Sequence, residues 1–150
     1  MKFGLCVMAV KKLRIILDTN WYISATINQK SRRRLYELLI NENIIIIFSN
    51  EILSEYNEVI RRNKFKKIIN HKQITRFMNL VISKTEITEI KSGLTGSRDL
   101  GDNFLLSLSH DSDADYLITG DLDLLVLKTT GITKIITLSD FGEIISPQTQ

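Results

Sequence analysis

Ile44-Ile45-Ile46-Ile47-Phe48 decides the fold, because five consecutive apolar residues are typical of a parallel strand that is buried on both faces. Two other short runs, 14–17 and 116–119, are rich in β-branched or aromatic residues, so we expect them to be strands as well. The sequence also predicts a last strand over 135–137 and a short edge strand over 87–90.

Helical patterns separate these strands. We expect a helix or turn over residues 21–27 and one helix or a pair of helices over 64–82. Further helical segments are expected from Ser31 through Leu39, over 51–62, from Asp102 to His110, and over 140–145. Ser31 and Ser49 are the expected N-caps of two of them, and Ile68 is an expected core residue. Because helices and strands mostly alternate, the sequence predicts an α/β protein whose central, mostly parallel sheet carries helices on both faces.

The chain has the size and composition of one soluble domain. Its 150 residues are 43% apolar and 25% charged, which is ordinary for a globular protein. Cys6 is the only cysteine, so an internal disulfide and a cysteine-based metal site are excluded and a cytoplasmic location is expected. The apolar run near the N-terminus is too short to span a bilayer, and we expect no membrane partner. We expect residues 1–13 to be a disordered extension, with Met1 or Met8 as the start, and residues 14–146 to form a single domain.

Acidic residues stand where a shared site can form. They are Asp18, Glu55, Asp102, Asp121 and Asp123. Asp18 and Asp121 follow predicted strands, and the carboxyl ends of parallel strands meet at one edge of a sheet. Asp102 opens a helix and Glu55 borders the buried face of another, so both can approach that edge. Crowded carboxylates repel one another unless a cation neutralises them, and oxygen ligands suit Mg2+. The pattern predicts a metal-dependent phosphoryl-transfer site.

Each acid also has a purely structural explanation. Asp18 can be a helix cap or a turn residue, and Asp102 can be favoured by the positive end of its helix. Glu55 has Glu51 and Glu58 nearby, which is typical of a solvated helix face. Each signal is weak alone, and only their joint occurrence is specific.

Basic residues are in excess elsewhere in the chain. The net charge is +3, and without the five acids it is +8. Basic clusters around an acidic centre suit a polyanion such as RNA or DNA, although either cluster alone is equally explained as a solvated helix face. One cluster is Arg32-Arg33-Arg34. The candidate RNA-binding residues lie in the other and are Arg61, Arg62, Lys64, Lys66 and Lys67.

Several other catalytic and binding classes are excluded. The sequence contains no phosphate-binding P-loop and no glycine-rich dinucleotide loop. His71 and His110 are the only histidines, and their spacing fits neither a metal site nor a Ser-His-Asp triad.

Four motifs together resemble the PIN domain family. They are L-D-T-N at 17–20, S-N-E-I-L-S-E-Y at 49–56, D-N-F-L-L at 102–106 and A-D-Y-L-I-T-G-D-L-D-L-L at 114–125. The likeness is greatest to the prokaryotic, VapC-like branch of toxin components of toxin–antitoxin pairs, and it covers nearly the whole chain. It implies a three-layer α/β/α fold and a Mg2+- or Mn2+-dependent ribonuclease that cleaves single-stranded RNA. It also implies a homodimer that a cognate antitoxin holds inactive.

The resemblance assigns a role to each acid. The four catalytic acids of the family fall on Asp18, Glu55, Asp102 and Asp121. Its metal ligands fall on Asp18, Asp102 and Asp121, and Asp123 is a further ligand or a water contact. Supporting polar residues fall on Thr19, Asn20 and Thr119. Trp21 departs from the family pattern, which has an aliphatic residue more often at this place, and it alters packing without removing a ligand.

Two alternatives remain open at this point. A non-catalytic PIN-like module could bind RNA or protein through the same surface. A haloacid-dehalogenase-like phosphatase also begins with an aspartate after its first strand, but that chemistry needs a second aspartate where this chain has Asn20.

Overall fold

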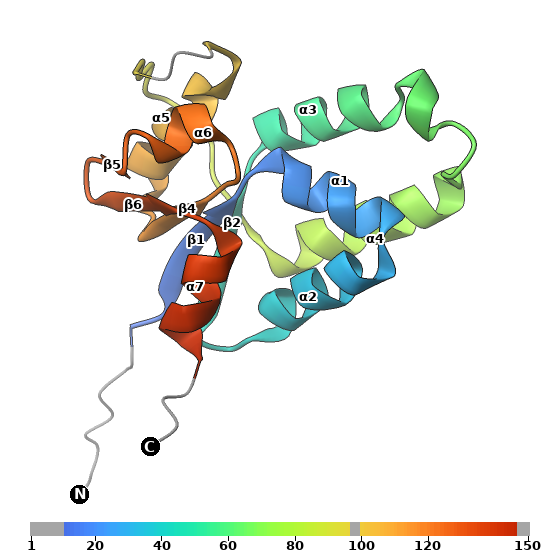
Figure 1. The fold of residues 1–150 in the computed structure, drawn as a ribbon, viewed down its shortest axis with the longest axis horizontal. Coiled ribbons are helices and arrows are strands. Elements are labelled where there is room, and N and C mark those ends of the chain that lie inside the picture. The colour runs from blue at the N-terminus through green and yellow to red at the C-terminus, as the bar shows by residue number, and fades with distance from the viewer. Residues whose placement is uncertain (1–10, 97–99, 147–150) are drawn as a thin grey trace, which may run out of the picture.

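A six-stranded, mostly parallel sheet forms the centre of the protein (Figure 1). The structure is a computed structural model that describes residues 11–96 and 100–146. The strands are β1 (Leu13–Leu17), β2 (Ile44–Phe48), β3 (Glu86–Ile87), β4 (Tyr116–Ile118), β5 (Thr129–Thr130) and β6 (Thr133–Ile136). Their order in the sheet is β3-β2-β1-β4-β6-β5, and only β5 is antiparallel to its neighbour.

Helices cover both faces of this sheet. They are α1 (Thr19–Ile27), α2 (Gln29–Ile40), α3 (Asn50–Ile60), α4 (His71–Lys84), α5 (Asn103–Ser112), α6 (Leu122–Leu125) and α7 (Leu138–Ile145). Two 3-10 turns, η1 (Asn63–Phe65) and η2 (Leu100–Asp102), join them. Helices α1 to α4 lie to one side of the strands, and α5 and α6 lie to the other (Figure 1). The fold is therefore the expected three-layer α/β/α arrangement.

The strand sequences explain why the sheet forms. Ile15 and Ile16 of β1 and Ile47 of β2 are completely buried, so successive side chains are covered on both faces of the sheet. Leu17 pairs with Ile118 in the parallel register of β1 and β4. Strands β1 and β4 therefore end at the same edge of the sheet, and Asp18 and Thr119 are the residues that directly follow them.

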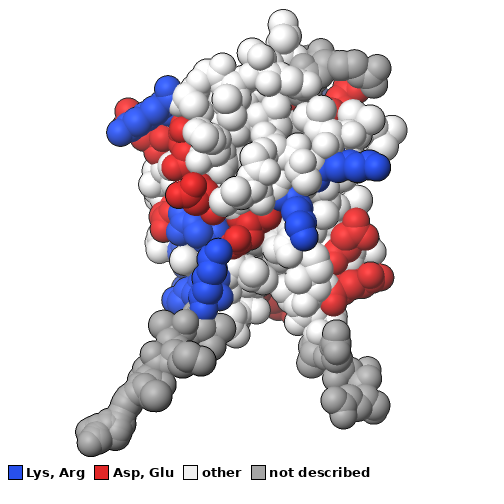
Figure 2. Space-filling model, turned by 90° about the vertical axis from the view of Figure 1, so that its left-hand side faces the viewer, with Lys and Arg blue, Asp and Glu red and all other residues white. Residues whose placement is uncertain are grey.

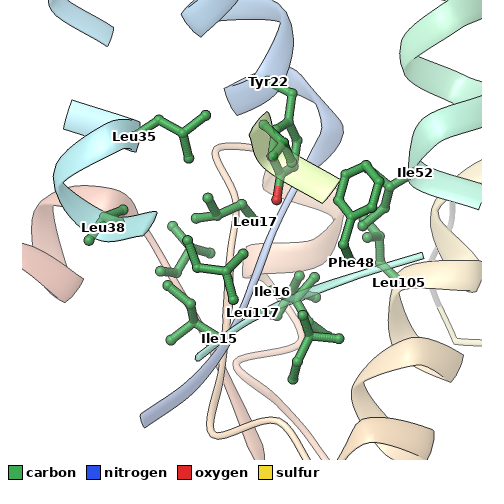
Figure 3. Close-up of a cluster of buried hydrophobic side chains, with 14 of the residues drawn as sticks. Ile15, Ile16, Leu17, Tyr22, Leu35, Leu38, Phe48, Ile52, Leu105 and Leu117 are labelled. Carbon is green, nitrogen blue, oxygen red and sulfur yellow. The ribbon is translucent and has the colours of Figure 1, made fainter. Parts of the chain in front are cut away.

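The core lies mainly between the sheet and α1 to α3 (Figure 3). Tyr22 of α1 meets Phe48 of β2 edge to face, with ring centroids 5.3 Å apart. Leu35 and Leu38 of α2 cover the neighbouring strands. Helix α1 is thereby packed against the carboxyl end of β2.

Asn28 is the N-cap of α2, so the expected cap at Ser31 is wrong. The Asn28 side chain accepts hydrogen bonds from the backbone N–H groups of Lys30, at 2.9 Å, and Ser31, at 3.1 Å. A single extended residue is enough to separate α1 from α2, and Ser31 then falls inside the first turn. By contrast, Ser49 caps α3 as expected.

Other boundaries also differ from the expectations. Where one helix or a pair of helices is expected over 64–82, the structure has the short η1 and then α4, which begins at His71. Ile68, between them, is 64% exposed rather than part of the core. Helix α6 and strand β5 are additional elements. Leu13 belongs to β1 and not to the N-terminal extension expected over 1–13, of which residues 1–10 lie outside the described residues. None of the described helices is both long enough and apolar enough to cross a membrane.

Candidate active site

Asp18 lies at the carboxyl end of β1 and is buried, with 5% of its surface exposed. It is the N-cap of α1, and its Oδ1 accepts a hydrogen bond from the backbone N–H of Asn20 at 3.3 Å. Its Oδ2 accepts a hydrogen bond of 2.6 Å from the hydroxyl of Thr119. The structural explanation of Asp18 as a cap is thus correct, but capping occupies only one of its two oxygens.

Asp121 lies beside this carboxylate at the end of β4. Its backbone N–H donates to Thr119 Oγ1 at 3.0 Å, so the Thr119 hydroxyl bridges the two acidic segments. Asp121 is half-buried and caps α6 by accepting a 2.9 Å hydrogen bond from the N–H of Asp123. The convergence that strand ends predict therefore occurs for Asp18 and Asp121.

Burial raises the pKa of Asp18 above its ordinary value of 3.8. Hydrogen bonds from Thr119 and from the backbone of Asn20 oppose this rise, and the negative charge of Asp121 adds to it. Within residues 11–96 and 100–146, no lysine or arginine side chain forms an ion pair with Asp18 or Asp121. A buried carboxylate beside a second acid, with no cationic side chain paired to it among the described residues, favours the binding of a cation.

The other expected site residues lie on three different elements. Glu55, on α3, is half-buried, as are Asp102, at the end of η2, and Asp123, in the first turn of α6. In the described part of the chain, no three His, Cys, Asp or Glu side chains stand close enough together to hold a metal ion. The structure thus brings together Asp18 and Asp121, and it does not gather Glu55 and Asp102 with them into a ligand set.

Two polar neighbours of Asp18 behave differently. The side chain of Asn20 is exposed, and only its backbone N–H touches the carboxylate. The hydroxyl of Thr19 is buried and has no hydrogen-bond partner among the described residues. Buried carboxylate and hydroxyl oxygens next to one another are a donor set that suits a hard divalent cation.

The candidate RNA-binding residues lie at the far end of α3 and beyond it. Arg61 and Lys66 line a groove of about 980 Å³ between α3 and α4, together with His71. Arg62 pairs with Glu58 at 3.1 Å, and the Lys64 ammonium lies over the ring of Phe65. Lys67 is exposed.

The second basic cluster is partly used in the fold. The guanidinium of Arg32 donates to the carbonyls of Ala25 and Thr26, both at 2.9 Å, and so satisfies the end of α1.

The side of the molecule that carries α5 and α6 shows broad uncharged surface, with its basic residues in small separate groups (Figure 2).

Sequence reasoning missed one contact at the site. The indole Nε1–H of Trp21 donates to the carbonyl of Ile118 at 3.2 Å, directly before Thr119. The only signal in the sequence was that Trp21 departs from the aliphatic residue more usual after L-D-T-N.

Fold and site define an α/β protein with a pair of carboxylates at the carboxyl edge of its parallel sheet. The chain belongs to the PIN domain family, whose model matches residues 14–123. The protein MJ1680 of Methanocaldococcus jannaschii, described as uncharacterized, is 29% identical over 119 residues, which cover 78% of this chain and 76% of that protein.

Two crystal structures have the same fold. One is VapBC2 from Rickettsia felis bound to a DNA fragment from their promoter, with a TM-score of 0.54, 19% identity, and coverage of 82% of this chain and 98% of that chain. The other is PAE2754 from Pyrobaculum aerophilum, with a TM-score of 0.55, 14% identity, and coverage of 91% and 93%. Identities this low show the fold alone. The expected PIN-like fold is confirmed.

PIN domains are generally nucleases and generally use divalent metal ions. The chemistry of the oxygens around Asp18 agrees with that use, because a divalent cation would balance two neighbouring carboxylates of which one is buried. Nuclease activity is the class of function that the family supports.

Proposed function

We propose that this protein is a metal-dependent endoribonuclease that cleaves single-stranded RNA. The observation that carries the proposal is the pair formed by Asp18 and Asp121, which the Thr119 hydroxyl joins at the ends of two adjacent parallel strands. Family membership supports hydrolysis of a phosphodiester, and the basic groove beside α3 supports a polyanionic substrate.

Asp18 and Asp121 are the residues that we expect to hold Mg2+ or Mn2+. Asp102 and Asp123 are further candidate ligands, and Glu55 is a candidate acid at the edge of the site. When bound, the cation would activate a water molecule and neutralise charge that develops on the phosphate. Thr119 would keep the Asp18 carboxylate ionised and oriented, because its hydroxyl favours the charged form.

The basic residues of the α3–α4 groove would hold the RNA backbone. Arg61 and Lys66 both line the groove, and none of the described residues that line it is acidic. Lys67 is exposed nearby. Arg62 forms an ion pair with Glu58, and this partly neutralises its charge and weakens its attraction for a phosphate. Aromatic side chains can stack on the bases of single-stranded RNA, but Tyr22 and Phe65 are buried and therefore unsuited to that role.

The biological role that we propose is that of the toxin in a toxin–antitoxin pair. The Rickettsia felis structure with this fold contains VapBC2 on promoter DNA, which supports a cognate antitoxin as the partner of this chain. We expect a homodimer in the cytoplasm. A small DNA-binding protein encoded next to this chain would support the pairing.

The test is cleavage of a labelled single-stranded RNA by the purified protein, with Mg2+, with Mn2+ or with EDTA. We expect cleavage with metal only, and we expect Asp18→Asn and Asp121→Asn each to reduce it by at least about 100-fold. Asp113→Asn is the matched control, because Asp113 is exposed, ends α5 in the left-handed conformation that asparagine also accepts, and lies away from the site.

The outcomes separate the proposal from its alternative. Activity that persists in Asp18→Asn would show contamination or a misplaced site. RNA binding without cleavage by the unchanged protein would favour a non-catalytic PIN-like binding module, an alternative consistent with the absence of a three-acid group from the described residues.

A further inference from the structure

Trp21 binds the ends of both strands that carry the carboxylate pair. Its backbone N–H donates to the carbonyl of Asp18 at 2.9 Å, and its indole N–H donates to the carbonyl of Ile118 at 3.2 Å. The Ile118 carbonyl also accepts the backbone N–H of Asp18 at 3.0 Å, which is the last hydrogen bond between β1 and β4. Trp21 therefore closes a ring of hydrogen bonds around the point where Asp18 and Thr119 leave the sheet.

The indole bond is not needed to satisfy the backbone. The carbonyl of Ile118 already has one partner in the N–H of Asp18, so an aliphatic residue at position 21 would leave no buried polar group without a bond. The ring is also only half-buried, and it lines a cavity of about 50 Å³ beside α2 and α7. The ring packs against the hydrophobic core, and its N–H adds a directed contact that packing alone does not require.

We propose that Trp21 is a positioning residue that holds the ends of β1 and β4 at the separation at which Asp18 and Asp121 share a divalent cation. This inference rests on the proposed function. Two like charges push the strand ends apart, and the Thr119 hydroxyl alone links the carboxylate of one strand end to the backbone of the other. Besides this link and the backbone bond from Asp18 to Ile118, the indole bond adds a further one, from α1 to β4, on the backbone side of the site.

The chain provides its own reporter for this role, because Trp21 is its only tryptophan. Emission from the unchanged protein at 295 nm excitation therefore comes from the indole that touches the site. We expect Mg2+ or Mn2+ to change this emission in the unchanged protein and to leave it unchanged in Asp18→Asn.

The variant Trp21→Phe keeps an aromatic ring and removes the indole N–H. We expect it to weaken Mn2+ binding, measured by calorimetry, by about fivefold, the amount that one neutral hydrogen bond supports. Half-maximal RNA cleavage should need a correspondingly higher metal concentration, while the KM for RNA at saturating metal stays the same. The matched control is Thr133→Val, which removes a buried side-chain bond to the Ala114 carbonyl at the opposite edge of the sheet.

Failure of this inference and failure of the proposed function look different. If the unchanged protein binds metal and cleaves RNA, and Trp21→Phe has the same Mn2+ affinity, Trp21 has no positioning role. If the unchanged protein binds no divalent metal, both proposals are wrong. If Trp21→Phe does not fold, the test is the tryptophan emission of the unchanged protein during titration with metal. Emission that stays constant while calorimetry records metal binding overturns the inference.

Discussion

Replacing Thr119 with valine tests the most direct link within the candidate site. Valine has nearly the same shape, so the change removes a hydroxyl without opening a cavity. Thr119 is completely buried, and its Oγ1 donates to Asp18 Oδ2 at 2.6 Å and accepts the N–H of Asp121 at 3.0 Å. The substitution therefore removes one bond to a carboxylate and one to a neutral donor at once.

The expected cost follows from these two bonds. A hydrogen bond to a charged group contributes about 1.5–3 kcal/mol and a neutral one about 0.5–1.5 kcal/mol, so Thr119→Val should lower the free energy of unfolding by about 2–4.5 kcal/mol. Thr133→Val is the matched control, because Thr133 is also fully buried and its hydroxyl bonds to one neutral carbonyl at 2.6 Å. It should cost about 1 kcal/mol.

The pH dependence gives the sharper result. The Thr119 bond stabilises the ionised form of Asp18, whose pKa in the folded protein lies above 3.8. The contribution of Thr119 is therefore fully present above that pKa and diminishes as the pH falls through it. The cost of Thr119→Val should be smaller at about pH 4 than at about pH 7.5, whereas the cost of Thr133→Val should not change.

Urea unfolding in EDTA at both pH values measures these differences, and a double-mutant cycle with Asp18→Asn isolates the pair. We expect a coupling energy of about 1.5–3 kcal/mol between Thr119 and Asp18. Equal costs for the two threonine variants, with no change with pH and no coupling to Asp18, would refute the reasoning.

Three further perturbations have definite expected results. Asp18→Asn should raise the metal-free stability at about pH 7.5, because burial raises the pKa of Asp18 and so makes its ionised form unfavourable in the folded protein. Below about pH 3.8 the carboxyl is protonated in both states, and the gain should disappear. Thermal unfolding at several pH values measures this, and a lower midpoint for the variant at neutral pH would contradict it. Tyr22→Phe should be neutral or stabilising by up to about 1 kcal/mol, since the buried Tyr22 hydroxyl has no hydrogen-bond partner among the described residues; a clear loss in urea unfolding would mean that the hydroxyl is satisfied. Asn28→Ala should cost about 1 kcal/mol and Ser31→Ala much less, because Asn28 is the cap of α2; equal costs would contradict the assignment.

The sequence was most informative where a local pattern has only one physical solution. The apolar run at 44–48 is a strand with the expected bounds, because continuous burial leaves no other regular structure of that length. Caps are harder, since Asn28 and Ser31 are both good N-caps and only the backbone angles select between them. Strand β5 is two exposed or half-buried threonines at the edge of the sheet, and such a segment carries no hydrophobic signal.

The same distinction applies to the site. Asp18 and Asp121 follow adjacent parallel strands, so topology alone brings them together. Glu55 and Asp102 belong to helices, and the position of a helix along its axis is not fixed by the order of the strands. The indole bond of Trp21 depends on the rotamer of one side chain, which no periodicity in the sequence encodes.

The hydrogen bond between Thr119 and Asp18 joins residues that are 101 positions apart. Strand β4 lies beside β1 in the sheet but is synthesised long after it. Asp121, the second carboxylate of the pair, is added only after β1, β2 and β3 have been synthesised. A growing chain can form β1, α1, α2 and β2 without ever presenting a complete acidic pair. If the pair is the nuclease centre, the protein cannot cleave RNA before β4 and Asp121 have been synthesised and have joined β1.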